Sequence, residues 1–336
     1  MSTIVVNEVI NQDDVVLEAI NLQKYFPTGA SKLLQRPTQL VQAVDGVSFS
    51  LRKGKTLAIV GESGCGKSTL ARLLARLIEP TSGSVLLNGE NVSTATSKQL
   101  LKMRRDIQVV FQDPYACLNP RHSIGQSIGT PIRIQKTMSR TDERHRVFEL
   151  MDLVGLSTEH YNRFPHEFSG GQRQRAGIAR ALALQPKVII ADEPVSALDV
   201  SIQAQILNLL EKLQADLDLS YVFIAHDLSV VRHIADEVAV MYLGKIVEIG
   251  TPEAVYGAPS HPYTQALMSA VPVPNPQLAS KRKRIILTGD VPSPVNPPSG
   301  CRFRTRCAKA QDICAVEEPL LFDRGQGRLV ACHFPD

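Results

Sequence analysis

The stretch GESGCGKST, residues 61–69, constrains the fold of this chain more than any other feature. It fits the pattern G-x-x-x-x-G-K-[ST], in which glycines let consecutive backbone N–H groups turn inward around phosphate oxygens. It follows the apolar run TLAIV and precedes the helical run TLARLLARL. This is the strand–loop–helix context that a phosphate-binding loop requires, so we expect a nucleotide at the start of that helix.

The same loop predicts which residues contact the nucleotide. Lys67 supplies a positive charge for the β- and γ-phosphates, and Ser68 supplies a hydroxyl that can ligate Mg²⁺. The predicted nucleotide-binding residues of the loop are Gly61, Ser63, Gly64, Cys65, Gly66, Lys67, Ser68 and Thr69.

Apolar runs rich in β-branched residues recur through the first 250 positions and alternate with segments of helical spacing. This alternation indicates an α/β fold with a mostly parallel sheet. Residues 113–185 carry helical patterns without a strand signal, which predicts a helical subdomain inserted into the sheet. We expect the nucleotide-binding domain to occupy residues 1–257 of the 336.

The run VIIADEP, residues 188–194, places two carboxylates at the end of a strand that is apolar on both faces. In open α/β sheets nucleotide chemistry takes place at such strand ends. Asp192 is predicted to hold Mg²⁺, directly or through water. Glu193 is predicted to polarise the attacking water.

The run FSGGQRQR, residues 168–175, resembles the signature motif of ABC-type ATPases, with Phe168 where leucine is usual. An S-G-G at a helix start is itself an anion-binding N-terminus. In that family the motif contacts the γ-phosphate of the ATP held by a partner subunit. The resemblance therefore implies that four residues act across a face-to-face dimer: Ser169, Gly170, Gly171 and Gln172.

Further motifs of the family follow in order. Gln112 in VVFQDP matches the glutamine that reaches Mg²⁺ and couples to membrane subunits. His226 in FIAHD matches the switch histidine at the γ-phosphate, and Tyr25 in LQKYF matches the aromatic that stacks on adenine. The resemblance covers about residues 15–257. It implies a mostly parallel sheet with an antiparallel β part and the helical insert, and catalytic roles for Glu193, His226 and Gln112.

Longer stretches of sequence indicate a particular branch of the family. FQDPYACLNPR, DEPVSALDVSIQAQILNLL and HPYTQAL resemble the ATP-binding subunits of dipeptide and oligopeptide importers, in particular the second, F-type, ATPase of that system. This implies ATP-driven peptide import with a D-type ATPase, two permease subunits and an extracytoplasmic peptide-binding protein. Close relatives carry nickel or other solutes, so such cargo stays an alternative. A non-transport ABC ATPase is a weaker alternative, because the chain has no room for a long coiled coil before the signature.

Composition argues against a membrane-spanning or secreted protein. No apolar run approaches the roughly 20 residues that span a bilayer, and the N-terminal MSTIVVNEVINQDD lacks the features of a signal peptide. The protein is therefore expected to stay in the cytoplasm, and its resemblance to importer subunits implies a peripheral position on the cytoplasmic face of the cell membrane. The net charge of +4, which includes the run KRKR at 281–284, is interpreted as a solvated basic surface that requires no nucleic acid.

The last part of the chain, residues 258–336, differs in composition. It holds VPVPNP and VPSPVNPPSG, and proline at this density blocks helices and central strands. We therefore expect a loop-built extension that cannot bury much apolar surface by itself.

This extension also holds four of the six cysteines: Cys301, Cys307, Cys314 and Cys332. Disulfides are disfavoured in a reducing cytoplasm, and unrelated free thiols stay open as an alternative. Metal ligation would stabilise the extension. The short C-x₂₋₄-C pairs usual for zinc are missing, whereas four cysteines suit a [4Fe–4S] cluster.

The resemblance to peptide-importer ATPases likewise implies an iron–sulfur cluster at these cysteines, with zinc as the alternative. Arg302, Arg304 and Arg306 are expected to offset the negative charge of such a cluster. The sequence leaves open whether this site is structural or regulatory.

Overall fold

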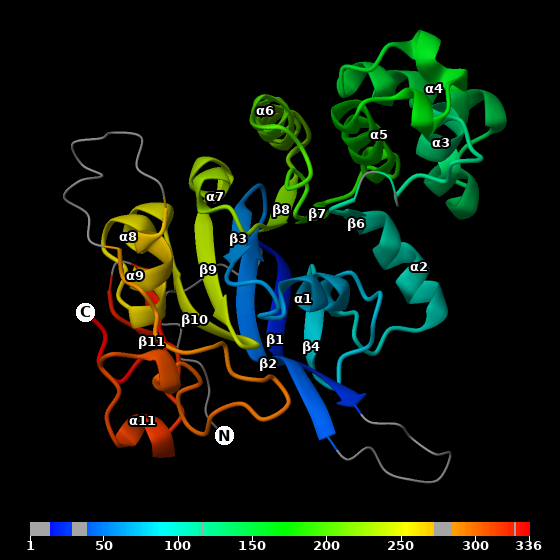
Figure 1. Cartoon of the computed structure of the whole chain (residues 1–336). Coiled ribbons are helices and arrows are strands. Elements are labelled where there is room, and N and C mark those ends of the chain that lie inside the picture. The colour runs from blue at the N-terminus through cyan, green and yellow to red at the C-terminus, as the bar shows by residue number, and fades with distance from the viewer. Residues whose placement is uncertain (1–13, 29–38, 114, 116, 272–283, 326) are drawn as a thin grey trace.

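A computed structural model describes residues 14–28, 39–113, 115, 117–271, 284–325 and 327–336. The N-terminal residues 1–13 and residues 281–283 of the KRKR run lie outside the described residues. Figure 1 shows a central sheet region, a helical lobe on one side of it and the C-terminal extension on the opposite side.

The main sheet has eight strands in the order β11-β12-β10-β9-β3-β8-β7-β6. Its centre is parallel, from β6 through β7, β8 and β3 to β9, and its other edge is antiparallel. Strand β7 is buried along its whole length. Alternate residues of β7 enter two different cores, as a central parallel strand requires: Ile189 packs in one and Ile190 in the other. The bounds are β3 (Thr56–Val60), β6 (Ile107–Val110), β7 (Val188–Asp192), β8 (Ser220–Ile224), β9 (Glu237–Tyr242), β10 (Lys245–Gly250), β11 (Phe322–Asp323) and β12 (Leu329–Val330).

A second, antiparallel sheet has the order β2-β1-β4-β5. Helix α1 (Lys67–Leu74) lies between the two sheets, because its Leu70 and Leu73 share one core with Leu17 of β1 and Ile59 of β3. The strands are β1 (Val15–Thr28), β2 (Gln39–Arg52), β4 (Ser82–Leu87) and β5 (Glu90–Asn91). The α/β fold class with an antiparallel part is confirmed.

The other face of the main sheet is covered by helices. The apolar sides of α6 and α7 pack there with β8 and with the helical lobe. The remaining helices of the main body are α2 (Ser97–Asp106), α6 (Val200–Leu217), α7 (Leu228–Ile234) and α8 (Pro252–Gly257). The lobe comprises α3 (Ile124–Gln135), α4 (Arg140–Leu153), two 3-10 turns at Thr158–Asn162 and Pro165–Glu167, and α5 (Gly170–Leu182). The boundaries predicted for the domains, at 113, 185 and 257, stay predictions.

The expectation of a purely loop-built extension is wrong in two respects. The extension forms α9 (Pro262–Ser269), a 3-10 turn (Arg304–Arg306) and α11 (Ile313–Val316), and its β12 pairs with β10 in the main sheet. Its Tyr263 and Phe303 are buried in the core of the main body, with ring centroids 5.5 Å apart. The extension therefore gains its apolar burial from the main body, which a count of its own residues could not reveal.

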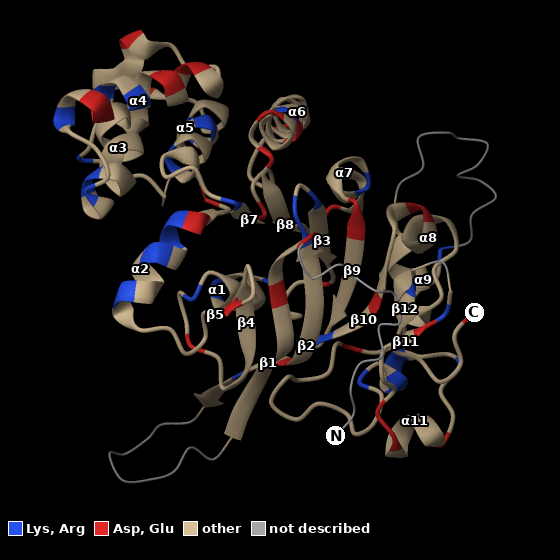
Figure 2. Cartoon of the chain, turned by 180° about the vertical axis from the view of Figure 1, so that it is seen from behind, with Lys and Arg blue, Asp and Glu red and all other residues tan. Residues whose placement is uncertain are grey.

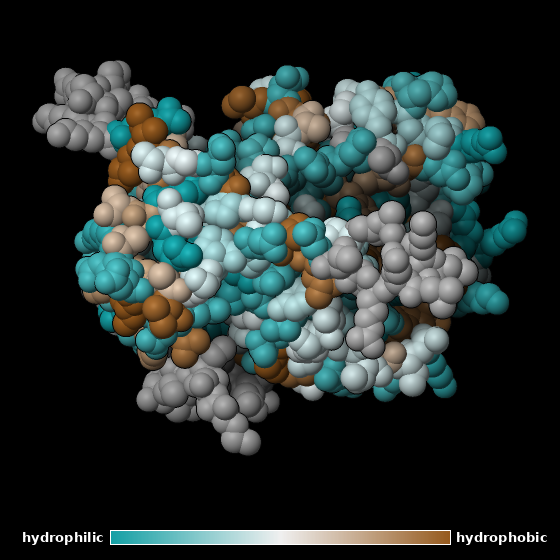
Figure 3. Space-filling view, turned by 60° about the horizontal axis from the view of Figure 1, so that its bottom comes forward, coloured by the Kyte–Doolittle hydropathy of each residue, from teal (hydrophilic) through white to brown (hydrophobic). Residues whose placement is uncertain are grey.

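The surface is mixed in charge and hydropathy. Figure 2 shows basic and acidic residues interspersed along the described ribbon. Figure 3 shows hydrophobic residues in separate small patches on the face turned forward. Within the described ranges, no helix combines the length and hydrophobicity needed to span a membrane.

Candidate nucleotide site

The phosphate loop lies between β3 and α1 and forms the floor of a pocket of about 710 Å³. Gly61 and Gly66 have φ values of 155° and 109°, and a Cβ on either would lie 2.1 Å from a backbone oxygen, so both positions require glycine. The pocket is lined by Val41, Ala43, Gly61, Glu62, Ser63, Gly64, Gly66, Lys67, Ser68, Thr69, Gln112, Glu193, His226, Leu267 and Pro294.

Two predicted loop residues have contrasting positions. The Lys67 ammonium donates to the carbonyl oxygens of Gly61 (2.8 Å) and Glu62 (3.0 Å), so it lies inside the loop. Cys65 is buried and does not line the pocket, and its Sγ lies 3.7 Å from the Lys67 Nζ. Cys65 thus supports the loop from beneath instead of offering its side chain to a ligand.

The strand-end carboxylate Asp192 lies behind Ser68. The Ser68 hydroxyl donates to Asp192 Oδ1 at 3.1 Å. Burial raises the pKa of Asp192 and the neighbouring Glu193 adds to the rise, while the hydrogen bond from Ser68 opposes it. A hydroxyl beside a buried carboxylate is an oxygen donor set that suits Mg²⁺.

Glu193 contacts the other two predicted catalytic residues. Its Oε2 accepts a hydrogen bond from Gln112 Nε2 at 2.8 Å and lies 3.2 Å from His226 Nδ1. Its backbone has φ 48°, a left-handed conformation that is costly for a residue with a side chain and is typical of functional sites. The structure therefore brings together three residues that come from separate segments of the chain.

The signature residues lie apart from this pocket. None of residues 169–172 is among those that line it. Ser169 caps α5: its hydroxyl accepts from the Gln172 N–H, and Gln172 Oε1 accepts from the Ser169 N–H. Ser169 is exposed, so its hydroxyl is accessible from outside the chain.

Tyr25 does not line the pocket either. Its hydroxyl donates to Asp45 Oδ1 at 2.5 Å, on the side of the extension. The next residue, Phe26, pairs in register with Val41, which does line the pocket, and directly opposed residues of antiparallel strands share a face. The Phe26 ring is 36% exposed. Sequence reasoning did not place Phe26 near the pocket, because β1 has an extra residue between Ala19 and Leu22, where Asn21 has φ 47°, and this bulge reverses which residues of the strand share a face.

Sequence reasoning also missed the contribution of the extension to the pocket. Leu267 of α9 and Pro294 line its wall, and the Pro294 carbonyl accepts from the N–H of Gln42 in β2 at 2.9 Å. Both residues lie in strings quoted above, HPYTQAL and VPSPVNPPSG, but neither string indicates a contact with the phosphate loop, since only the folded chain brings them there.

The four cysteines of the extension line one small pocket, which Arg304 and Lys309 also line. Burial raises the pKa of the Cys301 thiol to about 11, and the other three thiols add to the rise. In the part of the chain that the structure describes, no three His, Cys, Asp or Glu side chains are grouped so as to hold a metal ion. The four thiols are brought together but do not form a finished ligand set.

The expectation that three arginines offset a cluster is wrong for two of them. Arg302 pairs with Asp45, and Arg306 pairs with Glu62 of the phosphate loop. Only Arg304 lines the cysteine pocket. The other two are drawn away because carboxylates of the main body lie within reach.

Comparison with known proteins agrees with this geometry. Residues 44–196 match the family model of the ABC transporter, and residues 247–314 match that of the oligopeptide/dipeptide transporter C-terminal region. The chain is 53% identical to the dipeptide transport ATP-binding protein DppF of Haemophilus influenzae, over 97% of this chain and 99% of that protein. It is also 53% identical to the oligopeptide transport ATP-binding protein AppF of Bacillus subtilis, over 95% of this chain and 97% of that protein.

Solved structures show the same fold. The dimeric ATP-binding cassette MJ0796, bound to ADP and Pi, has a TM-score of 0.63 and 29% identity, covering 70% of this chain and 98% of its own. The cbiO1 protein of Clostridium perfringens, part of the cbiONQ transporter, has a TM-score of 0.63 and 28% identity, covering 73% of this chain and 92% of its own. The chain belongs to the ABC transporter family, to the ATP-binding proteins of dipeptide and oligopeptide transport.

Proposed function

We propose that this chain hydrolyses ATP to power the import of dipeptides or oligopeptides across the cell membrane. One observation carries the proposal: Glu193 lines the phosphate-loop pocket and contacts Gln112 and His226. The peptide cargo rests on the names of the relatives, which transport dipeptides and oligopeptides.

Each residue has a distinct task in this hydrolysis. Lys67 and the loop N–H groups bind the phosphates, and Glu193 polarises the attacking water. His226 contacts the γ-phosphate beside Glu193. Ser68, Gln112 and Asp192 would hold Mg²⁺, which supplies positive charge against the phosphate oxygens.

The site is completed by a second subunit. Ser169, Gly170, Gly171 and Gln172 lie outside the chain's own pocket, which supports their action on ATP bound to a partner ATPase. The dimeric state of the similar cassette MJ0796 supports the same arrangement. We propose a D-type ATPase as the partner.

The transporter requires membrane subunits. We propose that the chain sits on the cytoplasmic face of the membrane against two permease subunits, which receive peptide from an extracytoplasmic binding protein. The test is uptake into vesicles that contain the complete transporter. Labelled dipeptide should enter only with ATP, and Lys67→Ala should abolish both ATP binding and uptake. ATP-dependent uptake of nickel but not of peptide would overturn the peptide cargo.

We further propose that Phe26, not Tyr25, stacks on adenine. The exposed ring of Phe26 and its register with the pocket-lining Val41 support this assignment. An aromatic face at this place offers a sequence-independent platform for a nucleotide base.

Finally, we propose that Cys301, Cys307, Cys314 and Cys332 hold a [4Fe–4S] cluster, with zinc as the alternative. Their convergence on one pocket supports the donor set, because four thiolates are the usual ligands of this cluster. Arg304 lines the same pocket and offers the positive charge that thiolates favour, and Lys309 also lines it, with its ammonium paired with Asp336.

A further inference from the structure

The segment that runs from Cys301 to Cys307 contacts two parts of the chain that line the nucleotide pocket, the phosphate loop and β2. Phe303 anchors it, since its buried ring packs against Tyr242 and Tyr263 with centroids 5.2 and 5.5 Å apart. The two arginines that flank this anchor, Arg302 and Arg306, reach in different directions into the main body. Neither lines the cysteine pocket.

Arg306 binds the phosphate loop. Its Nη1 and Nη2 donate to the two carboxylate oxygens of Glu62 at 2.9 and 3.3 Å, which is a bidentate pair. The Arg306 side chain is 8% exposed and that of Glu62 is 28% exposed, so the pair is partly shielded from solvent. The backbone of Glu62 is held as well, because its N–H donates to the Tyr263 hydroxyl at 2.9 Å.

The charge of Glu62 makes this pair relevant to ATP. Glu62 lines the nucleotide pocket beside Ser63 and Gly64. An unpaired carboxylate there would repel the phosphates of a nucleotide, and like charges at short distance disfavour binding. Arg306 both neutralises this carboxylate and fixes the loop that carries it.

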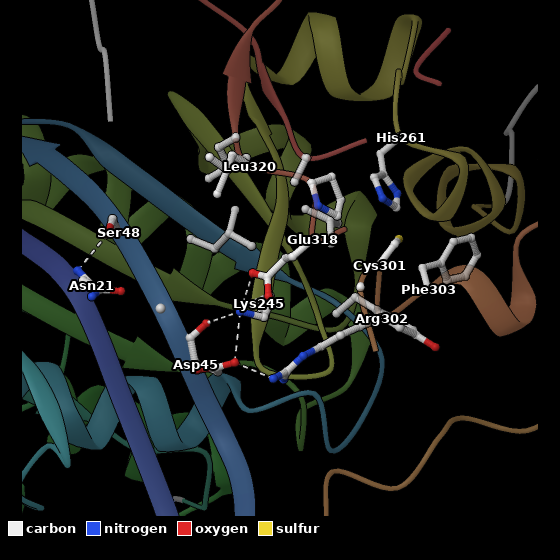
Figure 4. A pocket seen from close by; sticks show the side chains of 18 of the residues that line it. Asn21, Asp45, Ser48, Lys245, His261, Cys301, Arg302, Phe303, Glu318 and Leu320 are labelled. Carbon is white, nitrogen blue, oxygen red and sulfur yellow. Dashed lines mark hydrogen bonds and ion pairs between the residues drawn. The ribbon is translucent and has the colours of Figure 1, made fainter. Parts of the chain in front are cut away.

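Arg302 holds the opposite wall, which β2 provides. Its Nη2 pairs with Asp45 and donates to Gln42 Oε1 at 2.5 Å, while its Nη1 donates to the Leu243 carbonyl at 2.5 Å. Figure 4 shows Asp45 between Arg302 and Lys245, with Lys245 continuing to Glu318. Val41 and Ala43, the neighbours of Gln42, line the nucleotide pocket.

We propose that Arg302 and Arg306 are positioning residues of the ATP site, acting through β2 and through Glu62, so that the cysteine-bearing extension sets the affinity for ATP. The inference goes beyond hydrolysis and does not depend on what the cysteines bind. It gives the extension a task in nucleotide binding that the nucleotide motifs alone do not assign.

The test is titration of the full-length chain with a fluorescent ATP analogue. Arg306→Ala should weaken ATP binding about tenfold. Arg306→Lys should give an intermediate loss, because lysine keeps the positive charge but cannot form the bidentate hydrogen bonds of a guanidinium group. The matched control is Arg328→Ala, since Arg328 donates to Ala258 and Ser260 at the start of the extension and should leave binding unchanged.

A double-mutant cycle separates positioning from loss of stability. In a Glu62→Gln background, Arg306→Ala should have little further effect on affinity, whereas two independent effects would add. In the assembled ATPase the KM for ATP should rise with kcat nearly unchanged, because the variant loses an interaction that contributes equally to the ground state and the transition state.

If Arg306→Ala binds ATP like the wild type, or if its effect is the same with Gln at position 62, the proposal is wrong. Should Arg306→Ala fail to fold, Arg306→Lys in the same cycle decides the matter.

Discussion

The carboxylate of Glu193 lies against Gln112 and His226, and its backbone adopts a left-handed conformation that is costly for a residue with a side chain. Glu193→Gln should abolish hydrolysis by the assembled ATPase while ATP still binds, because the amide keeps the shape but cannot polarise water. Loss of general-base assistance lowers rates by about 10²–10⁴. Phosphate release and nucleotide titration measure the two effects.

Another glutamate provides the matched control for this change. Glu211 lies 3.5 Å from His233 on the outer helices and does not line the pocket. Glu211→Gln should hydrolyse ATP at the wild-type rate. Near wild-type hydrolysis by Glu193→Gln itself would contradict the assignment of the base.

The roles of Phe26 and Tyr25 can be distinguished by how substitution of each residue affects binding of ATP and of inorganic triphosphate. Phe26→Ala should weaken ATP binding about tenfold, since base stacking contributes ~1–3 kcal/mol, and should leave binding of inorganic triphosphate unchanged. Tyr25→Leu should show no such preference for ATP, because the hydroxyl it removes binds Asp45. An ATP-selective loss in Tyr25→Leu alone would restore Tyr25 as the stacking residue.

At the scale of elements, the start of α5 presents Ser169 to the outside of the chain. Its neighbour Gly171 is a poor probe, because a Cβ there would lie 2.6 Å from Ile202 Cγ2 of α6 and would shift the two helices. Ser169→Asp is cleaner, since aspartate keeps the helix cap and adds one negative charge.

Ser169→Asp should therefore lower hydrolysis by the ATPase pair about 100-fold, through repulsion of the partner's γ-phosphate. Nucleotide binding to the chain's own pocket should be unchanged. Ser169→Asn, which keeps the cap without the charge, should retain most of the activity. Weakened binding in the chain's own pocket would show that the signature acts within one subunit, contrary to the proposed dimer.

For the whole molecule, the cysteine pocket provides a test that is independent of ATP. Protein purified without oxygen should be brown, with absorbance at about 400 nm and about four iron atoms per chain. Cys314→Ser should lose the colour and lower the thermal midpoint, because a bound cluster adds its binding energy to folding. Cys117→Ser, at a cysteine outside this pocket, is the matched control.

Two other results would each exclude the cluster. Colourless protein with one zinc would favour the alternative metal. Metal-free protein with four titratable thiols in the extension would exclude both metals.

The sequence by itself determined the phosphate loop and the strand-end carboxylates. These depend on short stretches whose backbone geometry is encoded locally: Gly61 and Gly66 leave no room for a side chain, and VIIAD is apolar on both faces. The order of the motifs likewise predicted that Gln112, Glu193 and His226 belong to one site, and in the structure Glu193 contacts both of the other residues.

Only the tertiary structure decided which neighbours these segments have. A register shift in β1 turns Tyr25 toward Asp45 and leaves Phe26 in register with the pocket wall. The pairing of Arg306 with Glu62 joins residues 244 positions apart, and the pairing of β12 with β10 joins the extension to the main sheet. Local propensity carries no information about such contacts, because they are selected by packing, charge and burial once distant segments have met.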